Sequence, residues 1–105
     1  MAVRSVLIFQ VTPGRREDFL KQAAKAKSHF DRLGGRFRLA EIALGGPNSG
    51  HMVATVDYDD MAAYAAWMQK SHADSEWQKF QAEINNDEKP PRTQLSRALL
   101  VDIPV

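Results

Sequence analysis

Residues 51–80 read HMVATVDYDDMAAYAAWMQKSHADSEWQKF. The first ten alternate like a strand with one buried face and end on two aspartates. Asp59 is the predicted N-cap of the helix that follows, with Asp60 in its first turn, where a carboxylate favours the positive end of the helix dipole. The next ten residues are almost unbroken apolar, and the last ten carry a histidine, a tryptophan and a phenylalanine. We predict the third strand of a small sheet, followed by a helix that covers the sheet.

Branched and aromatic residues predict three further strands, at residues 3–11, 36–44 and 92–103. Thr12 and Pro13 predict the start of the first helix, because threonine caps helices and proline is tolerated at the first helical position.

The first helix is expected to run to about residue 33, where two glycines end it. The glycine-rich residues 45–50 predict a hairpin turn between the second and third strands. The second helix is expected to break near Ser71, with a new segment over residues 74–84. The resulting order, β-α-β-β-α-β, is typical of ferredoxin-like α+β folds, with a four-stranded antiparallel sheet and helices on one face.

The composition indicates an ordinary globular chain. It has 105 residues, of which 44% are hydrophobic and 26% charged, and we expect a single domain over residues 1–105. No cysteine is present, which excludes disulfides, thiolate zinc sites and cysteine nucleophiles. The longest apolar runs are too short to span a bilayer, and residues 1–4 do not lead into a signal-peptide core. We therefore expect a cytoplasmic protein that does not bind membranes.

Both faces of the predicted sheet carry apolar side chains. One set of alternating positions holds Leu7, Phe9, Leu39, Met52, Val56, Leu99 and Val101. The opposite set holds Val6, Ile8, Ile42, Leu44, Val53 and Leu100. Helices on one face would leave the other as an exposed apolar patch, which marks an interaction surface. We predict a homodimer closed through the sheets with two-fold symmetry.

The charge distribution fits either self-association or solvated helix faces. Residues 1–50 hold nine Lys or Arg against four Asp or Glu, whereas residues 51–105 hold five against nine. Halves of opposite sign can pair between two copies of the chain, but surface charges on solvated helices give the same count.

The chain resembles the dimeric α/β-barrel superfamily, nearest its antibiotic-biosynthesis-monooxygenase (ABM) and NIPSNAP types. The resemblance is carried by the element order, by Thr12-Pro13-Gly14 before the first helix and by the aspartate-capped helix after the third strand. Residues 74–80, which follow His72, also resemble the segment after the second helix in both types. The resemblance implies a homodimer, often with a pocket between sheet and helices. Members include cofactor-independent monooxygenases, haem-degrading enzymes, isomerases and proteins without known activity.

Two functions therefore stay open at the level of sequence. One is a monooxygenase without a bound cofactor, acting on a small aromatic or apolar compound. The other is a non-catalytic ligand-binding or assembly protein of the same fold.

His72 and Tyr64 are the candidate catalytic residues. His72 follows the apolar helix and can hold or move a proton near neutral pH, or it can bond the last carbonyls of that helix. Trp67, Trp77 and Phe80 are the candidate walls of a pocket for a flat apolar ligand. The alternative is that these aromatic side chains only fill the core.

Further candidates lie on the strands. His51 stands beside the glycine-rich turn, where it can line a pocket mouth or simply be an exposed hairpin residue. Tyr58 can bind a polar group of a ligand. The strand charges Arg38, Glu41 and Arg97 can pair, point into a cavity or mark an edge in water.

Several other functions are not supported by motifs. Haem-degrading relatives carry a histidine one helix segment after the tryptophan, and residues 77–81 contain none. RNA-recognition domains need aromatics on the third strand, and here the basic residues cluster on the first helix instead. No dinucleotide, Walker or zinc-protease motif occurs. We expect no cofactor, no metal and no nucleic-acid partner.

Overall fold

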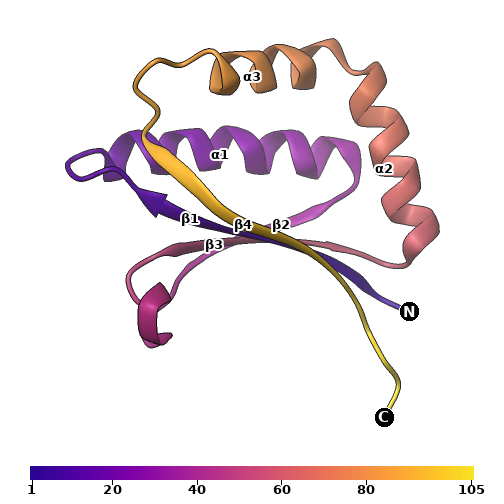
Figure 1. The fold of residues 1–105 in the computed structure, drawn as a ribbon. Helices are drawn as coiled ribbons and strands as arrows, with labels where there is room; N and C mark the ends of the chain where they lie inside the picture. The colour runs from indigo at the N-terminus through magenta and orange to yellow at the C-terminus, as the bar shows by residue number, and fades with distance from the viewer.

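A computed structural model describes residues 1–105 as a four-stranded sheet with three α-helices (Figure 1). The strands are β1 (Val3–Val11), β2 (Arg36–Glu41), β3 (Met52–Tyr58) and β4 (Arg92–Val101). The helices are α1 (Arg16–Leu33), α2 (Met61–Ala73) and α3 (Ser75–Asn85), with a single 3-10 turn at Gly46–Asn48. The predicted order of elements and the ferredoxin-like α+β fold are confirmed. None of the three helices has the length and the apolar composition of a membrane span.

The sheet has the order β2-β3-β1-β4, and every neighbouring pair is antiparallel. Leu7 lies opposite Ala54 on β3 and Arg97 on β4. Between Ile8 and Phe9 the register with β4 shifts: Ile8 faces Ser96, but Phe9 faces Gln94. The residue between them on β4 therefore bulges out of the ladder.

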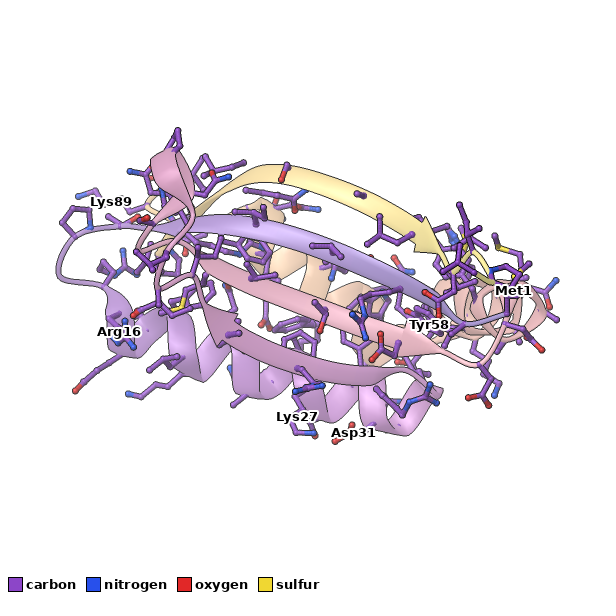
Figure 2. All side chains as sticks on the ribbon, turned by 90° about the horizontal axis from the view of Figure 1, so that it is seen from below. Met1, Arg16, Lys27, Asp31, Tyr58 and Lys89 are labelled. Atoms are coloured by element: carbon purple, nitrogen blue, oxygen red, sulfur yellow. The ribbon has the colours of Figure 1, made fainter.

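All three helices lie on one side of the sheet (Figure 1). The buried strand residues are Val3, Ser5 and Phe9 of β1 and Met52, Ala54, Val56 and Tyr58 of β3. The parity that contains Leu7 and Phe9 thus faces the helices. Seen from below, the opposite face carries no helix (Figure 2). That face contains Val6, Ile8 and Val53, all only half-buried.

The prediction that α2 covers the sheet was wrong. This helix stands at the end of the sheet and links β3 to α3 (Figure 1), and Ser71 is its only buried residue. The apolar side chains of α2 itself are spread over all sides of the helix, so α2 has no single apolar stripe to pack against the sheet. α1 takes that position, with Phe19, Phe30 and Leu33 buried.

Local predictions at the helix starts were partly wrong. Asp60, not Asp59, caps α2, and its Oδ1 accepts a hydrogen bond of 2.7 Å from the Ala63 N–H. Thr12 does not cap α1, which begins at Arg16; the Thr12 hydroxyl donates instead to the Pro90 carbonyl. Which residue occupies the N-cap position depends on where the preceding strand or turn ends, and local spacing does not determine that.

The outer strands are also shorter than predicted. β2 ends at Glu41 rather than residue 44, and β4 ends at Val101 rather than residue 103. The first residue of the predicted third strand, His51, lies just outside β3. Single backbone hydrogen bonds continue past the strand ends: the Ile42 N–H donates to the His51 carbonyl at 2.8 Å, and the Asp102 N–H donates to the Ala2 carbonyl at 3.0 Å.

The core is divided into two clusters. One lies around Phe9, Phe19, Met52 and Ala54. The larger cluster contains Val3, Phe30, Leu33, Val56, Tyr58, Trp77 and Phe80. α1 contributes to both clusters, and α3 contributes only to the larger one.

Candidate functional site

A cavity of about 230 Å³ lies between the sheet and the three helices. Of the 22 residues that line it, 16 are hydrophobic. All four strands supply its floor, and α1, α2 and α3 supply its walls. Because α2 stands upright, it carries α3 away from the sheet and leaves this space (Figure 1).

Aromatic rings form one wall of the cavity. The Trp67 ring stacks on Phe30 with centroids 5.1 Å apart and an interplanar angle of 13°. Trp77 meets Phe30 edge-on at 5.1 Å and Trp67 edge-on at 5.8 Å. Such pairs stabilise the arrangement of the rings by more than the burial of their area accounts for. The wall is therefore preformed for a flat ligand.

Trp67 also has an unused donor. Its indole Nε1–H is shielded from solvent and has no hydrogen-bond acceptor in the chain. A buried donor without an acceptor costs free energy, on the order of 1–3 kcal/mol. Since Trp67 lines the cavity, an oxygen atom of a ligand is a natural acceptor for it.

Two tyrosines lie beside this wall. The Tyr58 ring meets Tyr64 edge-on at 5.2 Å, and both residues line the cavity. Burial raises the pKa of the Tyr58 hydroxyl far above its ordinary value; the nearby Tyr64 adds to the rise and Arg97 opposes it. Tyr58 is therefore a neutral hydroxyl at physiological pH, able to donate a hydrogen bond.

The charged groups of the cavity are both cations. Arg92 and Arg97 line it, and no aspartate, glutamate or histidine does. The Arg92 guanidinium lies 4.6 Å from the centroid of the Phe9 ring, and its Nε donates to Gln22 Oε1 at 3.0 Å. Both arginines come from β4, which forms one edge of the sheet.

Five of the seven predicted site residues lie together in this cavity. These are Tyr58, Tyr64, Trp67, Trp77 and Phe80. His72 does not reach it: its side chain is exposed near the C-terminal end of α2. His51 also lies outside the lining, although its Nδ1 is shielded without a partner. Arg97, one of the three strand charges, lines the cavity but keeps an exposed side chain.

Sequence reasoning missed the polar residues Ser5, Gln22, Gln81, Arg92 and Gln94 of the lining. Ser5 shares its parity with the buried Val3 and Phe9, so a polar residue among core-facing positions was an available signal. Arg92 had no such signal, because only the register of β4 decides which face it takes.

The fold is shared with solved structures of other proteins. A NIPSNAP domain protein from Burkholderia xenovorans is 24% identical, with a TM-score of 0.69 over 98% of this chain and 95% of that one. A NIPSNAP family protein from Agrobacterium tumefaciens is 14% identical, with a TM-score of 0.69 over 97% and 86%. SnoaB, a cofactor-independent oxygenase from Streptomyces nogalater, is 18% identical, with a TM-score of 0.66 over 99% and 95%.

Sequence comparison is more specific than the fold. None of the curated proteins matches this chain significantly. The sequence profile of the NIPSNAP family matches residues 5–97. Since that match spans most of the 105 residues, the chain belongs to the NIPSNAP family.

Proposed function

We propose that this protein is a cytoplasmic homodimer that binds a small aromatic compound between its sheet and helices and oxidises it with O₂ without a bound cofactor. The observation that carries the proposal is the cavity of about 230 Å³ with a preformed aromatic wall and the unpaired Trp67 indole N–H. This volume lies below the roughly 300–1,000 Å³ of pockets for drug-sized ligands. A ligand of one or two rings fits it.

The chemistry follows from what the lining offers. An electron-rich ring system with an activated CH₂ can supply all the electrons that O₂ needs: the CH₂ becomes a carbonyl, and the second oxygen atom leaves as water. The Trp67 N–H and the Tyr58 hydroxyl would hold a negatively charged ring oxygen, which stabilises the electron-rich form. Tyr64 is the proposed proton carrier. His72 has no part in this proposal, because it is exposed outside the cavity.

The proposed dimer closes through the face of the sheet that carries no helix (Figure 2). Its centre contains the apolar side chains of Val6 and Ile8 on β1 and Val53 on β3, with Thr55 opposite Val6. The fold shared with SnoaB, a cofactor-independent oxygenase, supports the proposed oxidation.

The test uses hydroxylated 2-indanones and 2-tetralones, which have two rings and an activated CH₂ between the aromatic ring and a carbonyl. Binding should raise the melting temperature with the logarithm of ligand concentration above the Kd, by mass action. O₂ uptake should exceed that of buffer, with one oxygen atom from ¹⁸O₂ in the product. A melting shift without O₂ uptake would favour the alternative, a non-catalytic ligand-binding protein. No shift across the series would count against the pocket itself.

Two variants locate the effect in the cavity. Ala23→Leu adds volume at a lining position of α1 and should abolish both the shift and the O₂ uptake. Ala65→Leu, at an exposed position of α2, is the matched control and should change neither. Trp67→Phe keeps an aromatic ring but removes the N–H, and should weaken binding of hydroxylated rings by roughly tenfold.

A further inference from the structure

We propose that the ligand of this cavity is an aryl or alkyl carboxylate, whose carboxylate binds Arg92 while its apolar body lies against the aromatic wall. This inference rests on the proposed function only in taking the cavity as a ligand site. It does not depend on oxidation.

A β-bulge places both arginines of β4 on the cavity face. Arg92 and Arg97 are separated by an odd number of positions, so simple alternation would put them on opposite faces. The register shift near Leu95 reverses the alternation, and Arg97 then lies opposite Leu7 while Arg92 lies opposite Val11. Bulges recur where a strand re-aims a side chain next to a functional site.

The Arg92 side chain is oriented by neighbouring residues and has free donors for an anion. Its guanidinium lies over the Phe9 ring, and its Nε is fixed by Gln22 Oε1 at 3.0 Å. No hydrogen bond occupies its terminal Nη donors, whose fork matches a carboxylate. Burial lowers the pKa of the Arg92 guanidinium because desolvation disfavours its charge, and no anion of the chain opposes that effect.

The absence of a carboxylate partner is unusual in this chain. Of its eight arginines, five form ion pairs: Arg4, Arg15, Arg16, Arg32 and Arg36. Arg38, Arg92 and Arg97 form none. Two of these three line one cavity whose lining has no acidic residue. A half-buried cation of this kind is best compensated by an anion from outside the chain.

The proposed role of Arg97 differs from that of Arg92. Its side chain is exposed, although the residue lines the cavity, which places it at the opening. It also lies close enough to Tyr58 to favour the ionised hydroxyl. A cation at the mouth raises the local concentration of anions and speeds their entry without holding them.

The ligand class follows from the shape of the lining. With 16 hydrophobic residues among 22, most of the surface favours an apolar body, and one half-buried guanidinium favours a single planar anion. A phosphate ester carries more charge than this one buried cation neutralises. A carboxylate joined to one ring is the simplest match.

Calorimetric titration of the purified chain with three matched probes tests this assignment. They are 3-phenylpropanoate, 3-phenylpropanamide and 2-phenylethyl phosphate. We expect the carboxylate to bind roughly 10- to 100-fold more tightly than the amide, as a charge-assisted hydrogen bond requires. Equal binding of carboxylate and amide would overturn the inference while leaving the pocket intact. Tightest binding of the phosphate would overturn the carboxylate assignment, and no binding of any probe would overturn the pocket and the inference together.

Arginine variants assign the contact. Arg92→Gln should remove the preference for the carboxylate and leave amide binding unchanged. Arg97→Gln should slow association and keep most of the preference, and Arg38→Gln, outside the cavity and equally unpaired, should change nothing. Melting curves check that each variant folds. If Arg92→Gln does not fold, Arg92→Lys, which keeps the charge and the stem but loses the fork, should lower the preference several-fold. If Arg92→Gln keeps the preference for the carboxylate and Arg97→Gln loses it, the assignment to Arg92 is overturned.

Discussion

Arg32, in the last turn of α1, and Asp74, the N-cap of α3, form a two-fold hydrogen-bonded ion pair with N–O distances of 2.9 and 2.7 Å. Asp74 Oδ2 also accepts the Trp77 N–H at 2.8 Å, and Arg32 Nη2 lies 2.8 Å from His29 Nδ1. One carboxylate thus joins the end of α1 to the start of α3. That junction fixes α3 above the cavity.

Replacing Asp74 should destabilise the chain more than replacing a surface carboxylate. Asp74→Ala removes the pair with Arg32 and the cap of α3 together, so we expect a clear fall in melting temperature. Asp31→Ala is the control, because Asp31 pairs with Lys27 in an i,i+4 pair in which both side chains are more than half exposed. Equal melting temperatures of the two variants would contradict the structural importance of the junction.

The same pair predicts a dependence of stability on pH. The Arg32 hydrogen bonds, followed by the Trp77 N–H, lower the pKa of Asp74 to about 2, against about 3.9 for an unfolded aspartate. Because the pKa of Asp74 is lower in the folded state, its ionisation stabilises the folded chain at pH values above the unfolded pKa. This contribution is lost as the pH falls through about 2.

Chemical denaturation at pH values from 6 to about 2 checks this dependence. Wild-type protein should lose more unfolding free energy below about pH 4 than Asp74→Asn, which keeps a capping oxygen but cannot ionise. Parallel curves for the two proteins would show that Asp74 does not titrate as predicted.

Gly35 should not tolerate a side chain. Gly35 is buried directly before β2. A Cβ there would lie 2.7 Å from Val56 Cγ1 and 3.1 Å from Phe30 Cδ1. We expect Gly35→Ala to cost about 1–3 kcal/mol of unfolding free energy through overpacking. Adding Val56→Ala should recover part of that cost, so the double variant should be less destabilised than the sum of the two single variants.

The uncovered face of the sheet should control the oligomeric state. We expect wild-type protein to sediment at twice its chain mass of 11.8 kDa, and Val6→Lys to sediment as a folded monomer, since a charge at the centre of an apolar interface is costly. Ala65→Lys, on the exposed side of α2, should remain dimeric. A wild-type monomer at micromolar concentration would contradict the proposed dimer.

Several features of the fold could be predicted because they are local. The alternation in residues 3–11 and 52–58 marks strands, and the spacing of Phe19 and Phe30 marks one stripe of α1. The aromatic residues that the sequence offered as pocket walls, Trp67, Trp77 and Phe80, all line the cavity.

Other features depend on contacts between distant segments. Asp59 and Asp60 are equally good caps by residue type, and the end of β3 leaves Asp60 in the capping position while Asp59 pairs with Arg36. His72 follows the apolar helix at a plausible spacing, but the upright α2 turns it to solvent. Helix orientation is decided by packing partners and not by the helix itself.

The sequence by itself determined the order of strands and helices and the ferredoxin-like class, because hydrophobic periodicity and turn residues act within one segment. Only the tertiary structure decided which sheet face meets the helices and that Arg92 and Arg97 share it. The pairing of β1 with β4 contains the bulge that reverses the alternation. Such a bulge is a property of two strands far apart in the chain, so no periodicity within either strand predicts it.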